Sequence, residues 1–304
     1  MTSFVTGYVM GHDLMDLDTG TLNDTAPASG RTIMLVHGMW SRPHVWQNFR
    51  HYFEARGYRV ITPVLRHHDI EPGETPDPAL ATTSLLDYAA DLEREIRLLG
   101  EKPILIGHSM GGTLAQMLTA RGLSSGSILL ASAHCAPVFA VSFSVMKYIA
   151  RVLGRKSFWR HTQIPSYAVI REIGLNGMSE RDAHNHYATL VPESGRVVFE
   201  LAFWFLDRTR AALVDARAIS APLLFLTGTN DRLTPLASAQ RTAAYYGAKA
   251  KLEALQGHAH WLPTEPGWEN IAARALSFIE NELQAAEVKT GATTVAPALD
   301  PQLV

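Results

Sequence analysis

The chain has 304 residues, of which 47% are hydrophobic and 18% charged, and this length and composition are ample for a fully packed core. Its formal charge is −2, from 27 basic and 29 acidic side chains, so the charge balance gives no case for a nucleic-acid partner. A single cysteine, Cys135, excludes an internal disulfide and fits a reducing compartment.

The two ends of the chain differ from its middle. Residues 1–30 are polar and predict an arm with at most one short strand or hairpin; they lack the cationic start and apolar stretch of a signal peptide. Residues 286–304 are rich in Thr, Ala and Pro and predict a poorly ordered tail. The longest apolar runs, 136–146 and 197–206, are too short to span a bilayer. We therefore expect a cytoplasmic protein with no integral membrane segment.

Between the ends, short apolar runs alternate with helical patterns. The helix expected over 84–100 has Ser84 at its N-cap position and Gly100 just past its end. Because parallel strands need long crossover connections, the alternation predicts a mostly parallel sheet with helices on both faces. The expected strands cover 32–38, 58–65, 102–108, 126–133, 222–228 and 251–255, and the expected helices cover 44–57, 84–100, 110–122, 235–247 and 267–283.

The alternation is interrupted once. Residues 134–217 show several helical patterns and no strand pattern. A helical block of this size inside one crossover predicts a cap above the strand ends. The sequence thus predicts a core formed by residues 31–133 and 218–285, with the cap inserted between them.

The most informative motif is GHSMGG at 107–112, where Ser109 lies between a predicted strand and a predicted helix. The pattern G-x-S-x-G in this context predicts a strained turn that only glycine tolerates at its flanks. Such a turn presents the hydroxyl at the C-terminal edge of the sheet, and the free N–H groups of the following helix point at a nearby oxyanion. The alternative is a Gly-rich junction with an N-capping serine, but the context favours Ser109 as a nucleophile.

Four segments in this order carry a resemblance to a known family: LVHGMW (35–40), GHSMGG, TGTNDRLTP (227–235) and HAHWLPTEPGW (258–268). Together they resemble the α/β-hydrolase superfamily, specifically its Ser-nucleophile esterase and lipase-like branch. The resemblance covers residues 30–283 and implies the α/β-hydrolase fold with an inserted helical cap. A serine at position 109 argues against the haloalkane dehalogenase and epoxide hydrolase branches, which carry aspartate there.

The resemblance also implies the partners of the serine, in the chain order Ser, acid, His. Asp231 follows the strand expected at 222–228 and matches the acid, although it could instead cap the next helix. His260, which precedes Trp261, matches the base, and His258 is then left to line the pocket or to bond its loop.

Two further expectations concern the ligands of the site. His37-Gly38 resembles the family's HG turn, which implies an oxyanion hole formed by the N–H groups of Met39 and Met110. The H-x-H pattern of His258 and His260 also occurs in metal sites, but it needs further ligands. The 67–69 segment HHD is a conceivable source of them, but a surface or loop-bonding role is the better interpretation of that segment. We expect no metal and no cofactor, and the nucleotide motifs GxGxxG and GxxxxGK[ST] are absent.

The cap is expected to set the substrate. One hypothesis is a hydrophobic acyl or aromatic pocket beneath it; the alternative is that most of its apolar residues only pack the cap on itself and on the sheet. The candidates for the pocket are Trp40, His108, Phe139, Phe143, Phe199, Phe203, His258 and Trp261.

The combined expectation is a serine hydrolase that cleaves a small-molecule carboxylic ester through a Ser109–His260–Asp231 triad and an acyl-enzyme. The same three residues support lactonase, thioesterase, carbon–carbon hydrolase, perhydrolase and hydroxynitrile lyase chemistry. A non-catalytic ligand receptor on the same scaffold is the alternative from another class.

Overall fold

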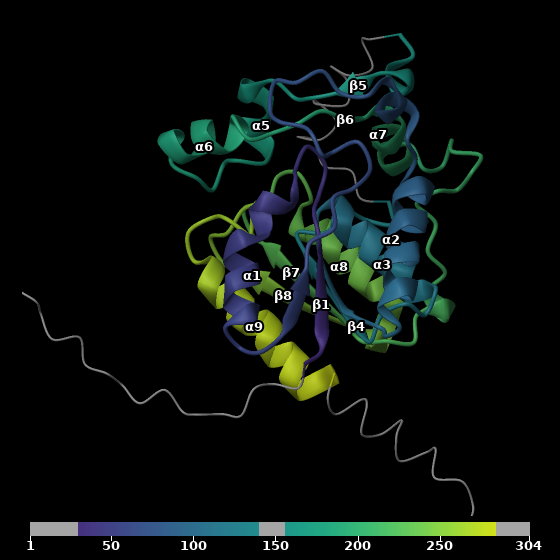
Figure 1. Ribbon diagram of the computed structural model, residues 1–304, viewed down its shortest axis with the longest axis vertical. Coiled ribbons are helices and arrows are strands. Elements are labelled where there is room, and N and C mark those ends of the chain that lie inside the picture. Colours follow the sequence, from purple (N-terminus) through teal and green to yellow (C-terminus); the bar gives the residue numbers. More distant parts are fainter. Residues whose placement is uncertain (1–29, 140–155, 284–304) are drawn as a thin grey trace, which may run out of the picture.

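The computed structural model describes residues 30–139 and 156–283, so the predicted arm and tail lie outside the described residues. A six-stranded sheet with the order β2-β1-β3-β4-β7-β8 forms the centre of the molecule (Figure 1), and every neighbouring pair of strands is parallel. The strands are β1 (Thr32–Val36), β2 (Arg59–Ile61), β3 (Ile104–His108), β4 (Gly126–Leu130), β7 (Leu223–Gly228) and β8 (Ala250–Leu255).

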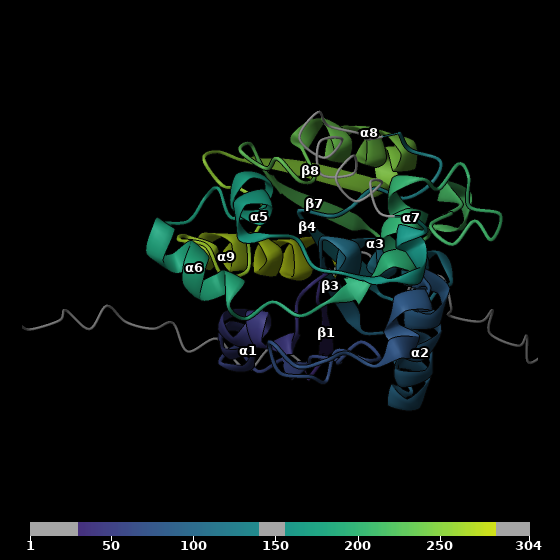
Figure 2. The same ribbon diagram turned by 90° about the horizontal axis from the view of Figure 1, so that it is seen from above.

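Helices cover both faces of this sheet. In β1, Ile33 and Leu35 pack with α1 and α9, whereas Met34 and Val36 pack with α2, α3 and α8 (Figure 2). Both sets of side chains are fully buried, which is why the strands are apolar throughout. The helices are α1 (Gln47–Glu54), α2 (Leu85–Leu99), α3 (Met110–Ala120), α8 (Leu236–Tyr246) and α9 (Trp268–Phe278).

Local signals set the ends of these elements. Ser84 and Asp87 form a capping box at the start of α2, and Gly100 ends the helix with φ 72°, as its place in the sequence predicted. The strand expected over 58–65 is shorter, because β2 is an edge strand that ends at Ile61, before Pro63, which has no N–H for the ladder.

Residues 156–217, between β4 and β7 in the chain, lie above the C-terminal edge of the sheet (Figure 1). Within residues 156–217, which we call the cap segment, the helices are α5 (Tyr167–Ile173), α6 (Glu180–Tyr187) and α7 (Gly195–Ala202). The expectation of no strand here is wrong, since β5 (Thr162–Gln163) pairs antiparallel with β6 (Glu193–Ser194). Strands of two residues are too short to produce an alternating pattern. Residues 140–155 of the predicted cap lie outside the described residues.

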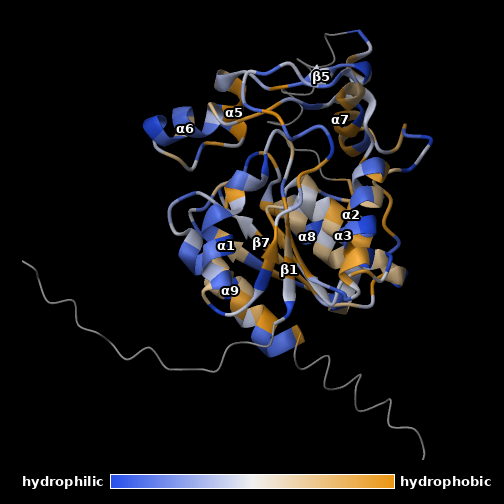
Figure 3. Ribbon diagram, viewed as in Figure 1, coloured by the Kyte–Doolittle hydropathy of each residue, from blue (hydrophilic) through white to orange (hydrophobic). Residues whose placement is uncertain are grey.

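The cap segment is joined to the core by hydrogen bonds on two sides. Trp40 Nε1 donates to the carbonyl of Gln163 at 3.1 Å, and its own carbonyl accepts from the Val191 N–H at 3.0 Å. Ser194 Oγ donates to the carbonyl of Thr83, just before α2, at 2.6 Å. Helix α6 of the cap segment is polar on most of its surface (Figure 3), and Ala183 is its single buried residue.

No helix within residues 30–139 and 156–283 combines the length and the apolarity needed to cross a lipid bilayer.

Candidate active site

Ser109 stands at the junction of β3 and α3 in an unusual backbone conformation, with φ 53° and ψ −119°. Non-glycine residues rarely adopt a positive φ, and the strain persists only where the surroundings determine the backbone. Here the N–H of Ser109 donates to the Leu130 carbonyl at 3.0 Å, and its carbonyl accepts from Gly112 and Ala133 at 2.9 Å. The turn is therefore held on both sides of the serine.

The glycine before the serine is required by space. A Cβ at Gly107 would collide with the carbonyl group of Gly111 in the first turn of α3. Close packing of β3 against α3 thus explains the G-x-S-x-G spacing, as the sequence predicted from the strand–turn–helix context. The side chain of Ser109 is almost buried, and its hydroxyl makes no hydrogen bond to any residue that the structure describes.

Asp231 and His260 form a buried pair above the ends of β7 and β8. His260 Nδ1 lies 2.9 Å from Asp231 Oδ2, and the two side chains are 1% and 0% exposed. The other carboxylate oxygen, Oδ1, accepts from the N–H groups of Leu233 and Thr234 at 2.9 and 2.8 Å. Because an ionised carboxylate only accepts, the proton belongs on His260 Nδ1, which leaves Nε2 as the basic nitrogen.

His108 links this pair to the turn that carries the serine. Its ring lies 4.9 Å from the ring of His260, and its Nε2 donates to the His260 carbonyl at 2.9 Å. Burial, together with the neighbouring His260, holds the pKa of His108 well below its usual range. His108 therefore stays neutral. Because it immediately precedes Ser109, its hydrogen bond joins the loop of His260 to the serine turn.

The loop after β1 also lies against the turn of Ser109. An added Cβ at Gly38 would be 2.9 Å from Ser109 Cβ, so the backbone of this loop touches the nucleophile turn. His37 Nδ1 donates to the Gly38 carbonyl at 3.0 Å, and His37 Nε2 accepts from the Leu65 N–H at 3.3 Å. Burial and, next, the nearby His68 lower the pKa of His37 to about 3, so its ring is neutral.

This arrangement leaves two amides for an oxyanion. A trans peptide points its C=O and N–H in opposite directions, so the bond from His37 to the Gly38 carbonyl directs the Met39 N–H away from His37. The second amide belongs to Met110, the first residue of α3, whose N–H has no acceptor within its own helix. The assignment of these two amides to the oxyanion hole stays a prediction.

The candidate pocket residues lie in three places. Trp40 and Trp261 are buried, and Trp261 lies between His108 and His186, at ring distances of 5.7 and 4.6 Å. Phe199 of α7 and Phe203, which follows this helix directly, stack on each other at 5.9 Å.

The remaining candidates for the pocket are Phe139, Phe143 and His258. Phe139 is 56% exposed and packs on Trp204, and Phe143 lies outside the described residues. His258 lies 3.4 Å from Glu265 Oε1 and has a different carboxylate partner from His260. Within the described part of the chain, no group of three or more His, Cys, Asp or Glu side chains is arranged to hold a metal ion.

Three residues at the site were not found by sequence reasoning. The hydroxyl of Thr234 lies 2.7 Å from Asp231 Oδ2 and 3.2 Å from His260 Nδ1. Its position three residues after the aspartate is a weak signal for such a turn. Glu193 and His68 are both fully buried, and His68 Nε2 lies 3.3 Å from Glu193 Oε2. The two residues are far apart in the sequence, and no motif predicts their contact.

The fold and this arrangement define the class of protein. Residues 33–274 match the model of the alpha/beta hydrolase family, and the chain belongs to that family. The six-stranded parallel sheet with helices on both faces is the α/β-hydrolase fold, so the prediction of fold and superfamily is confirmed.

Individual relatives are distant. A non-heme haloperoxidase of Rhodococcus erythropolis is 26% identical over 83% of this chain and 93% of its own length. Among solved structures, the monoacylglycerol lipase of Paleococcus ferrophilus has a TM-score of 0.60 at 20% identity, covering 82% of this chain and 95% of the lipase. Tomato methylketone synthase I has a TM-score of 0.64 at 18% identity, covering 85% of this chain and all of that one. At these identities, the structural likeness carries the fold alone.

Proposed function

We propose that this chain is a serine hydrolase that cleaves a carboxylic ester with an apolar acyl or aromatic group. The observation that carries the proposal is the buried Asp231–His260 pair, which His108 ties to the strained turn of Ser109. A serine hydroxyl is a poor nucleophile at neutral pH, and it needs both a base and a group that orients the base.

The proposed reaction has two halves. Ser109 Oγ attacks the ester carbonyl while His260 Nε2 takes its proton, and Asp231 stabilises the imidazolium that forms. The N–H groups of Met39 and Met110 bind the oxyanion, then His260 returns the proton to the leaving alcohol and an acyl-enzyme remains. Water, activated by His260, hydrolyses the acyl-enzyme and restores Ser109.

The substrate class is supported by the cap segment. Phe158, Phe199 and Phe203 form an aromatic cluster with ring distances between 5.9 and 6.4 Å, suited to contact an apolar acyl or aromatic group. One structural neighbour is a monoacylglycerol lipase, and an apolar acyl ester agrees with that name. We further propose that residues 134–217 act as the cap that selects this group.

A second candidate follows from the relative named as a non-heme haloperoxidase. This candidate is perhydrolysis, in which hydrogen peroxide instead of water would attack the acyl-enzyme, release a peracid and restore Ser109. Turnover of an ester in the presence of hydrogen peroxide, with the peracid measured directly, separates perhydrolysis from plain hydrolysis.

The main test compares the wild-type chain with Ser109→Ala. We expect the variant to lose both labelling by a fluorophosphonate and turnover of 4-nitrophenyl butyrate, with little change in Tm. Ser124→Ala, which removes another buried hydroxyl near Thr119 and Ser127, is the matched control and should retain both. Wild-type turnover by Ser109→Ala would refute the nucleophile, and labelling without turnover of esters, a lactone or a thioester would favour a receptor.

A further inference from the structure

A buried carboxylate of the cap segment is the starting point. Glu193 of β6 is 0% exposed, and its Oε1 accepts from Tyr88 Oη at 2.7 Å and from the Ser194 N–H at 2.6 Å. Its other oxygen, Oε2, faces His68 Nε2 of the core at 3.3 Å. A buried carboxylate is costly unless it is paired and hydrogen-bonded, and here all its partners but one belong to the core.

His68 carries the contact onward. Its Nδ1 lies 3.1 Å from the Arg66 carbonyl, which only accepts, so Nδ1 holds a proton and donates it there. Nε2 faces Glu193 Oε2 at 3.3 Å as an ion pair without hydrogen-bond geometry. Burial lowers the pKa of His68, but Glu193, together with the Arg66 carbonyl and Asp69, outweighs burial and raises it. His68 is thus held by a hydrogen bond at one ring nitrogen and by a carboxylate at the other.

The ring of His68 forms one wall of the site of His37. The two ring centroids are 5.4 Å apart, and the main-chain turn from Leu65 to His68 is closed by a bond of 3.0 Å. The Leu65 N–H in that turn is the one that donates to His37 Nε2. Any shift of His68 therefore acts on His37 both through its ring and through its backbone.

His37 in turn sets the peptide beside the nucleophile. Its Nδ1 donates to the carbonyl of Gly38, and the N–H of that same peptide group belongs to Met39. Because a trans peptide is rigid, fixing the carbonyl fixes the direction of the N–H. Gly38 is also the residue whose added Cβ would lie 2.9 Å from Ser109 Cβ.

From these contacts, and resting on the function proposed above, we infer that Glu193 is a positioning residue for the oxyanion hole. It acts through His68 and His37 on the Gly38–Met39 peptide. Because Glu193 belongs to the cap segment and the peptide to the core, the oxyanion hole is correctly formed only while β6 is seated on the core.

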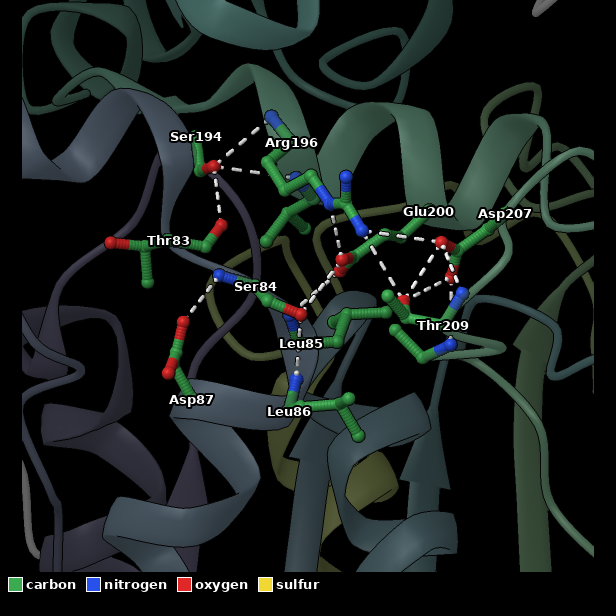
Figure 4. Close-up of polar contacts among 12 residues, drawn as sticks. Thr83, Ser84, Leu85, Leu86, Asp87, Ser194, Arg196, Glu200, Asp207 and Thr209 are labelled. Atoms are coloured by element: carbon green, nitrogen blue, oxygen red, sulfur yellow. Dashed lines mark hydrogen bonds and ion pairs between the residues drawn. The ribbon is translucent and has the colours of Figure 1, made fainter.

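A second buried carboxylate offers a matched control. Glu200 of α7 is also 0% exposed and also binds the start of α2, where it accepts from Ser84 Oγ at 2.7 Å and from the Leu85 N–H at 2.8 Å (Figure 4). Figure 4 shows its other partner, Arg196, on the same helix. Glu200 anchors the cap segment as Glu193 does, but its contacts do not lead to His37.

The experiment compares Glu193→Gln with Glu200→Gln. The readouts are kcat and KM for 4-nitrophenyl butyrate and the inhibition constant of 1,1,1-trifluoro-2-octanone, whose adduct with a serine carries an oxyanion. We expect Glu193→Gln to lower kcat roughly tenfold and to raise the inhibition constant of the ketone by a similar factor, with KM nearly unchanged. We expect Glu200→Gln to lower Tm while kcat and the inhibition constant stay within about twofold of wild type.

Contrary outcomes are distinct. Equal effects of the two variants on kcat and on the ketone, or an effect of Glu193→Gln on KM alone, would reduce Glu193 to an anchor of the cap. If Glu193→Gln does not fold, Tyr88→Phe removes one hydrogen bond from Glu193 and should shift kcat and the ketone constant together by a smaller factor; no shift overturns the inference. Ser109→Ala, measured in parallel, tests the reaction itself: its activity would overturn the proposed function and this inference together.

Discussion

At the scale of single residues, two histidines of one loop face different carboxylates. His260 Nδ1 lies 2.9 Å from Asp231, whereas His258 Nδ1 lies 3.4 Å from Glu265. We expect His260→Ala to lower kcat for 4-nitrophenyl butyrate by about 10³-fold or more, because the base is lost. His258→Ala is the matched control and should cost far less. The reverse ranking would place the base at His258.

Thr234 gives a finer prediction at the same scale. Its hydroxyl lies 2.7 Å from Asp231 Oδ2 and 2.8 Å from the Ala131 carbonyl, just after β4, and it donates its single proton to one of these two acceptors. Thr234→Val keeps the shape of the side chain and removes this hydroxyl. We expect a loss of about 1–2 kcal/mol in the free energy of unfolding, measured by urea titration, together with a lower kcat.

The control for Thr234 is Thr242→Val in α8. Thr242 is also buried, but its hydroxyl donates only to the Ser238 carbonyl one turn earlier in its own helix. Its replacement should leave kcat unchanged. If both variants lower kcat equally, Thr234 has no particular role in orienting Asp231.

At the scale of elements, the ends of helix α2 show which contacts the sequence could predict and which it could not. Ser84 and Gly100 mark its ends through contacts within a few residues, and such local chemistry is readable from the chain. Glu200, which binds the same N-terminus, comes from 115 residues away. Its pattern in the sequence is that of any glutamate in a helix, so only the fold shows that it is buried.

The candidate site follows the same division. Ser109, Asp231 and His260 each follow the C-terminal end of a strand, and parallel strands bring those ends to one edge, so their placement at one edge of the sheet could be expected. The contact of Glu193 with His68 depends on how β6 of the cap segment sits on the core. No periodicity or motif describes that placement, because β6 has only two residues.

The seating of α7 on α2 leads to a prediction about stability. In the ion pair Arg196–Glu200, the carboxylate is fully buried. The ion pair Arg50–Glu54 on α1 has the same spacing of four residues, but both of its side chains are exposed in part. We expect Glu200→Gln to lower the free energy of unfolding by about 1–3 kcal/mol, because buried N–H and O–H donors lose a charged acceptor. Glu54→Gln should change it by less than about 0.5 kcal/mol. Equal effects in urea titrations would contradict the anchoring role of Glu200.

At the scale of the whole molecule, burial keeps several histidines neutral inside the fold. Burial lowers the pKa of His37 to about 3, with His68 as the next cause. Burial likewise lowers the pKa of His134 to about 4 and that of His186 to about 3. An unfolded chain takes up protons at these positions below the ordinary histidine pKa of about 6.5, and the folded chain does not.

The sign of the resulting pH dependence follows from linkage. A group whose pKa is lowered by folding stabilises the folded state less as the pH falls below its unfolded pKa. Each of the three histidines should therefore cost about 2 kcal/mol between pH 7 and pH 5. His68 acts in the opposite direction: its pKa is raised, so its contribution is complete at low pH and is lost as the pH rises through the folded value.

The histidines whose pKa burial lowers, His108 among them, outnumber His68, so we expect the protein to lose much of its stability between pH 7 and pH 5, as measured by urea titration at each pH. His186→Gln should flatten this loss by about 2 kcal/mol, because a glutamine takes up no proton in either state. His51→Gln, on the exposed face of α1, is the surface control for this substitution. A wild-type stability that is constant or rises toward pH 5 would mean that these histidines accept protons inside the fold.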